Sequence, residues 1–152
     1  MQAVSSTANT VKKKVGQHIL DMAATVKYKD YEIHLSSKYK GKAKPWEGDH
    51  EMDAHKVFIK IGNVQVETDY YCHEKRLNAK ELRYVLYLHL SDGISFKNAG
   101  SLNEFFREFG YGDNPEAGIK AYEGCKQAWF DWKVFNIDPY KLADWLQEKY
   151  DF

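Results

Sequence analysis

The stretch HKVFIKIGNVQVET, residues 55–68, decides the fold. Aliphatic residues occupy every second position on both sides of the dipeptide Gly62-Asn63. A period of two is typical of a strand with one buried face, and Gly-Asn between two such runs favours a tight reversal of the chain. The sequence therefore predicts an antiparallel β-hairpin.

Upstream of the hairpin, Tyr31, Ile33 and Leu35 alternate with polar residues and predict a third strand within residues 28–35. Residues 36–52 are rich in Lys, Gly and Asp, and we expect a long loop there. Residues 1–8 are small and polar, and we expect them to be flexible. Apolar residues at spacings of three and four predict a helix over residues 7–26, before the predicted third strand. They are Val11, Val15, Ile19, Met22 and Val26.

Downstream of the hairpin, four helix-start signals follow one another: Asn78, Ser101, Asn114-Pro115 and Asp138-Pro139. The first helix is expected to end at Asp92-Gly93, and the third to run to about residue 134. One side of the third helix is expected to be apolar. That side carries Ile119, Tyr122, Cys125, Lys126, Trp129 and Phe130.

Segregated strands and helices predict an α+β fold. We expect an N-terminal helix, a three-stranded antiparallel sheet and about four C-terminal helices packed on the sheet. The 152 residues correspond to a single domain, 1–152, on the usual size range.

The overall charge is balanced, with 22 basic and 22 acidic residues. A strong nucleic-acid binder usually carries a basic excess, so the total does not favour that class. Residues 102–152 hold 6 Lys or Arg and 10 Asp or Glu. No apolar run is long enough to span a bilayer and the start lacks the pattern of a signal peptide, so we expect a cytoplasmic protein with reduced cysteines.

Metal and nucleophile patterns are weak. A structural zinc site needs four converging ligands in paired spacing, and His50, His55, Cys72 and His73 only partly supply it. Cys72 with His73 or His34 could form a thiolate pair, and Cys125 is expected to be a buried apolar residue. No recognised catalytic motif is present. We therefore expect no enzyme, no metal and no cofactor, and a metal or redox role for these His and Cys residues stays open.

Four large aromatics crowd the segment WFDWKVF, residues 129–135. Two interpretations stay open. The helix is buried on both sides, or Trp132 is an exposed anchor for a partner, because Trp often dominates interface energy.

From about Lys56 to Trp129 the chain resembles a set of small proteins encoded by bacteriophages and prophages. The resemblance rests on the strand pair, on LNAKEL at 77–82, on NAGSLNEFFREFGY at 98–111 and on AYEGCKQA at 121–128. It supplies no catalytic residue. It implies a phage accessory protein, a group that includes anti-CRISPR and anti-restriction inhibitors.

The leading hypothesis is an anti-CRISPR type inhibitor in the host cytoplasm that binds a bacterial protein or ribonucleoprotein effector and blocks its nucleic-acid access. Its contact surface is expected to be acidic and helical, through Glu104, Glu108, Glu116, Glu123, Asp131, Trp132 and Asp144. The alternative is a nucleic-acid-binding accessory protein. Its contacts are expected at Lys12, Lys13, Lys14, Lys38, Lys40, Lys42 and Lys44. The oligomeric state stays open.

Overall fold

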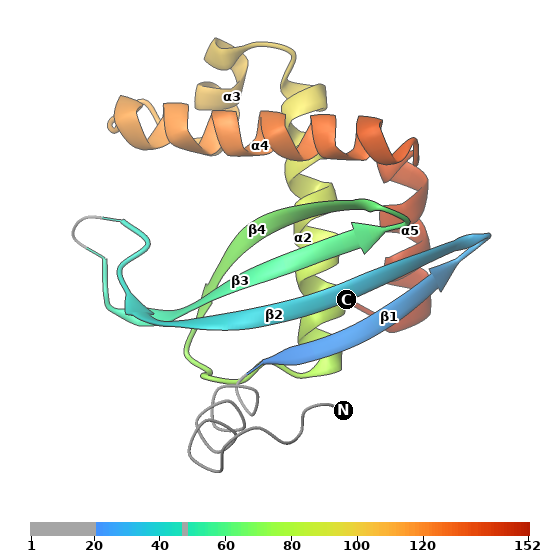
Figure 1. The fold of residues 1–152 in the computed structure, drawn as a ribbon. Coiled ribbons are helices and arrows are strands. Elements are labelled where there is room, and N and C mark those ends of the chain that lie inside the picture. Colours follow the sequence, from blue (N-terminus) through green and yellow to red (C-terminus); the bar gives the residue numbers. More distant parts are fainter. Residues whose placement is uncertain (1–20, 47–48) are drawn as a thin grey trace. The chain divides into compact units, whose positions relative to one another are not determined.

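The structure, a computed structural model, describes residues 21–46 and 49–152. Four strands form one antiparallel sheet in the order β1-β2-β3-β4, and four helices follow in the chain (Figure 1). The α+β class is confirmed, and the sheet has one strand more than predicted. The elements are β1 Met22–Tyr28, β2 Tyr31–Ala43, β3 Met52–Ile61, β4 Val64–Cys72, α2 Ala79–Ala99, α3 Leu102–Phe109, α4 Pro115–Phe135 and α5 Pro139–Tyr150.

Strand β1 replaces the end of the helix predicted over residues 7–26, and that part of the prediction is wrong. Val26 and Tyr28 are buried while Thr25 and Lys27 are exposed, which is the alternation of a strand. Met22 and Val26 are four residues apart, a spacing that fits both a helix and a strand. The remainder of the predicted helix, and residues 1–8, lie outside the described residues.

Strand β2 continues through residues 36–43, so the prediction of a loop over residues 36–52 is wrong for that part. The strand ends at Ala43, and the described residues 44–46 and 49–51 belong to the connection to β3. The pairing with β3 shifts between Tyr39, opposite His55, and Gly41, opposite Ala54. One extra residue, Lys40, is therefore accommodated in a β-bulge. Gly41 has φ of +94°, a conformation that a side chain disfavours.

The predicted hairpin β3–β4 is confirmed. Ile61 pairs with Val64 around Gly62, whose φ is +62°. One sheet face is apolar in its central part and buries Val26, Ile33, Leu35, Val57 and Ile59. On the other face, Lys56 forms ion pairs with Glu67 at 3.4 Å and Asp69 at 2.7 Å.

The four predicted helix starts are confirmed, because a side-chain oxygen at each accepts a hydrogen bond from a backbone N–H of the first turn. The predicted stop at Asp92-Gly93 is wrong, since α2 continues to Ala99. A Cβ at Gly93 would lie 3.0 Å from the backbone nitrogen of Trp129, so glycine lets α4 approach α2 closely. That glycine serves packing and does not end the helix.

The chain divides into two compact units between Arg83 and Tyr84, and each is described by itself. The first contains the sheet and the start of α2, and the second contains the remaining helices. The predicted single domain and the predicted packing of the helices on the sheet stay predictions.

Candidate protein-binding surface on helix α4

Trp132 is buried, with 1% of its surface exposed, so it is not the exposed anchor of the second interpretation. Its indole N–H donates a hydrogen bond to Nδ1 of His89 at 2.8 Å. Asp131 is also buried, and its Oδ2 lies 3.1 Å from Nε2 of His89. Gln127 donates to the other carboxylate oxygen at 2.9 Å. Trp132 and Asp131 are therefore removed from the predicted acidic surface.

These contacts fix the tautomer of His89. The indole nitrogen of Trp can only donate, so Nδ1 of His89 must accept. The ring proton then lies on Nε2 and is donated to Asp131. All three side chains are satisfied by one another in the core of the second unit, which indicates a structural network.

The buried side of α4 is built from small residues around the large Trp132 and Phe135: Ala117, Gly118 and Ala128. A Cβ at Gly118 would lie 2.6 Å from the ring of Phe106, so this side is in close contact with α3. The predicted apolar side therefore lies more than a third of a turn away from the observed one, at about 100° per residue. Ile119 and Phe130, expected to be buried, are exposed instead.

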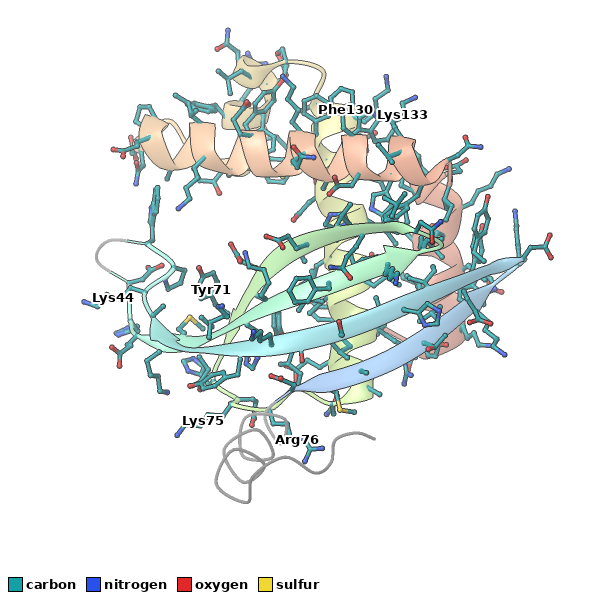
Figure 2. The ribbon with its side chains drawn as sticks, viewed as in Figure 1. Lys44, Tyr71, Lys75, Arg76, Phe130 and Lys133 are labelled. Atoms are coloured by element: carbon teal, nitrogen blue, oxygen red, sulfur yellow. The ribbon has the colours of Figure 1, made fainter. Side chains whose placement is uncertain are left out.

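The opposite side of α4 is a continuous exposed strip, called here the α4 face. At about 100° per residue its members fall within an arc of about 100°. Three of them are large and apolar, with 50% of Ile119, 48% of Phe130 and 64% of Val134 exposed. Figure 2 shows Phe130 and Lys133 on this helix. The α4 face consists of Glu116, Ile119, Glu123, Lys126, Phe130, Lys133 and Val134.

Charges along the α4 face change sign. Glu116 and Glu123 stand in the N-terminal half, and Lys126 and Lys133 in the C-terminal half. Acidic residues near a helix N-terminus and basic residues near its C-terminus complement the helix dipole, so this order also stabilises the helix itself. The exposed apolar residues are not explained by the helix dipole, although the ring of Phe130 also contacts that of Phe96, with centroids 6.3 Å apart. Their exposure makes the α4 face a candidate binding surface.

The other predicted acidic residues lie on other helices. Glu104, on α3, is paired with Arg107 at 2.8 Å. Glu108 on α3 and Asp144 on α5 are exposed. Only Glu116 and Glu123 of the predicted set belong to the α4 face. The apolar members could have been found from the sequence only by recognising that α4 packs through its small residues.

The predicted lysines of the nucleic-acid alternative do not form one loop. Lys38 and Lys40 are exposed on β2. Beyond the bulge, Lys42 contacts Asp53 at 3.2 Å, while Lys44 follows the strand and lies at the same end of the first unit as Lys75 (Figure 2). Lys12, Lys13 and Lys14 lie outside the described residues.

A polar cluster occupies one end of the first unit. The hydroxyl of Tyr39 donates to Asp53 at 2.6 Å, and Asp53 is buried. Nε2 of His55 and Sγ of Cys72 both donate to the carbonyl oxygen of Glu74, at 2.7 and 3.4 Å. The pairing of β3 with β4 brings Cys72 and His55 to the same carbonyl oxygen.

Proton affinities in this cluster disfavour nucleophilic chemistry. The hydrogen bond to Asp53, followed by burial, raises the pKa of Tyr39 to about 12. Burial raises the pKa of Cys72, and the nearby carboxylates of Glu81, Asp53 and Glu74 raise it further. A thiol in such surroundings stays protonated, whereas a reactive one needs a lowered pKa. The cluster joins β2, β3 and β4 and presents no activated thiolate.

Cys125 is not an activated thiol either, and the histidines considered for metal binding do not converge on one site. Burial, followed by the carboxylate of Asp92, raises the pKa of Cys125 to about 12. Within the described part of the chain, no group of three or more His, Cys, Asp or Glu side chains is placed to hold a metal ion. His50 and His73 are exposed, and His55 is buried on β3.

Across residues 21–46 and 49–152, no helix is both long enough and apolar enough to pass through a membrane. Comparisons with protein-family models, with curated proteins and with solved structures found no match to this chain.

Proposed function

We propose that this protein is a phage-encoded inhibitor of a bacterial defence system, of the anti-CRISPR type, and that it binds its effector through the α4 face. The supporting observation is the exposure of Ile119, Phe130 and Val134 in one row. A soluble protein rarely leaves such a row uncovered unless it meets a partner. The proposal involves binding only, in the cytoplasm of the host cell.

The dimensions of the α4 face suit a helix that docks into a shallow groove. Ile119 and Val134 are 15 residues apart, which corresponds to about 22 Å along a helix. Helix-in-groove recognition uses side chains at this kind of spacing as anchors. Phe130 is the expected central anchor, because aromatic side chains often dominate the binding energy of an interface.

The two acidic residues of the α4 face give the proposal its mechanism. Glu116 and Glu123 would meet Lys or Arg side chains of the effector's nucleic-acid channel and compete with phosphates for them. Glu123 lies one turn from Ile119, so the charged and apolar contacts would be made together. Such steering accelerates association and weakens as salt is added.

The test uses phage plating on bacteria that carry one defence system each, across a panel that includes CRISPR systems. Expression of the wild-type chain should restore plaques for at least one system. Phe130→Asp and Ile119→Asp should abolish that restoration, because each places a carboxylate within the apolar contact. Val64→Asp is the matched control, since Val64 is 39% exposed and belongs to the first unit, whereas α4 belongs to the second.

Restoration by all three variants would refute the α4 face as the binding surface. No restoration by the wild-type chain against any system of the panel would contradict the function itself. Nucleic-acid binding is measured in parallel by fluorescence anisotropy with single- and double-stranded DNA at rising salt. Micromolar affinity that falls steeply with salt would favour the nucleic-acid alternative instead.

A further inference from the structure

An open hollow of about 500 Å³ lies at the corner between α4 and α5, next to the C-terminal end of the α4 face. Five of its lining residues are aromatic or apolar, and three are polar or charged. The lining residues are Trp129, Trp132, Lys133, Asn136, Ile137, Asp138, Pro139 and Tyr140. Lys133 belongs to both the hollow and the α4 face, so the two surfaces are continuous.

Two aromatic rings form part of the lining in a fixed arrangement. The rings of Trp129 and Tyr140 meet edge to face, with centroids 6.4 Å apart and an angle of 73°. The hydroxyl of Tyr140 donates to Oδ1 of Asn98 at 2.5 Å, which holds its ring in place. A prearranged aromatic lining reduces the entropy lost when a side chain is bound.

The charge at this site is positive. The ammonium groups of Lys97 and Lys133 lie 5.7 and 5.6 Å from the ring centre of Trp129. Neither forms an ion pair with another residue of the described chain. The acidic residue of the lining, Asp138, is engaged at the start of α5, where its Oδ1 accepts from the backbone N–H of Tyr140 at 3.0 Å. The two lysines are therefore available to an anion.

We propose that this hollow receives an aromatic side chain of the partner protein that is flanked by carboxylates. The ring would contact Trp129 and Tyr140 in the hollow, and the carboxylates would reach Lys97 and Lys133. The inference rests on the proposed function and adds the chemistry of the partner at the C-terminal end of α4. A peptide is favoured over a nucleotide because the hollow continues the α4 face, the proposed protein-binding surface.

The test follows the indole N–H signals of the ¹⁵N-labelled full chain by NMR, with Trp129 assigned from a Trp129→Phe variant. The probes are acetyl-Asp-Phe-Asp-amide, acetyl-Lys-Phe-Lys-amide, acetyl-Asp-Ala-Asp-amide and a short deoxythymidine oligonucleotide. The first probe should shift the Trp129 signal in a saturable way. Its half-saturation should come at a concentration about tenfold lower than for the other two peptides.

Charge reversal supplies the second part of the test. Lys97→Glu and Lys133→Glu should each weaken binding of the Asp-Phe-Asp probe by at least about threefold. Lys120→Glu is the matched control and should leave it unchanged, since Lys120 lies on α4 outside the α4 face, about 20 Å further along the helix. Equal binding of the acidic and basic peptides, no shift up to 10 mM of probe (on the order of weak fragment binding), or tighter binding of the oligonucleotide would overturn the inference.

The two proposals fail in different ways. Absence of peptide binding, together with loss of inhibition in Phe130→Asp, would overturn the hollow and support the α4 face. Peptide binding at the hollow, together with full inhibition by Phe130→Asp, would overturn the α4 face and support the hollow.

Discussion

Replacing Trp132 by Phe is expected to destabilise the protein by about 2–4 kcal/mol. The variant keeps an aromatic ring but removes the N–H that His89 accepts at 2.8 Å. His89 is 4% exposed, so water does not replace that donor. A buried acceptor left without a partner costs about 1–3 kcal/mol, and the smaller ring leaves a void that adds about 1 kcal/mol.

The assay is urea denaturation of four chains: wild type, Trp132→Phe, His89→Leu and the double variant. The single variants should have a coupling energy of at least about 1 kcal/mol, because each disrupts the same hydrogen bond. The thermal midpoint of Trp132→Phe should fall by about 4–16 °C, at about 2–4 °C per kcal/mol for a chain of this size. Trp145→Phe serves as the control, since Trp145 is only partly buried.

A coupling energy below about 0.5 kcal/mol would refute the reasoning, since pairs without contact usually add within that limit. The same holds if Trp145→Phe is as destabilising as Trp132→Phe. Long-range ¹H–¹⁵N correlation spectra give an independent check, because they should show the proton of His89 on Nε2.

Gly118→Ala should destabilise the protein by about 1–3 kcal/mol, because the added methyl group collides with the side chains packed on that side of α4. Gly124→Ala should stabilise it by about 0.5–1 kcal/mol, because no neighbouring atom lies within 4 Å of the added Cβ. Equal effects of the two variants in urea denaturation would contradict the assigned packing of α4. Cys125 should react with iodoacetamide at pH 8 far more slowly than in the unfolded chain, since its pKa is raised to about 12 and the thiolate is the reactive form; mass spectrometry of modified peptides measures both rates, and equal rates would argue against burial of the thiol. The hydrogen bond from Tyr39, supported by Lys42, lowers the pKa of Asp53 below its usual 3.8, so its stabilising contribution is present above that pH and is lost as the pH falls further. Unfolding free energies between pH 2 and pH 6 should therefore show a smaller pH dependence in Asp53→Asn than in the wild type, and identical curves would show that Asp53 is not involved.

The parts of the fold that depend on neighbours in sequence could be predicted. The hairpin around Gly62-Asn63 and the caps at Ser101 and Asn114 depend on a few consecutive residues, and the structure confirms them. Capping is satisfied within one helical turn, so no distant contact can change it.

The errors arise where contacts with residues distant in the sequence determine the local structure. The composition of residues 36–52, rich in Lys, Gly and Asp, predicts a loop, whereas residues 36–43 continue β2. The inward residues of this part of the strand, Ser37 and Tyr39, are polar. Their partners come from elsewhere: Ser37 accepts from the backbone of Met22, and Tyr39 donates to Asp53. Gly93 suggested a helix end, whereas its role is to let another helix approach.

The candidate site was predicted only in part. Glu116 and Glu123 are on the α4 face, while Asp131 and Trp132 are buried with His89, which is more than 40 residues away in the sequence. The prediction placed Ile119 and Phe130 on the buried side because they are large and apolar. The helix instead packs through Ala and Gly, because small residues let backbones come close.

The bulge at Lys40 changes which residues of β2 face the buried side of the sheet. Before it, residues with odd numbers face the buried side of the sheet; after it, residues with even numbers do, and for this reason Lys42 reaches Asp53. Without that residue, Gly41 would follow Tyr39 directly and still lie opposite Ala54, so the last part of the strand would keep its partners and its faces. A strand with such a bulge can gain or lose one residue at this point while the residues on either side keep their orientation, without a new fold.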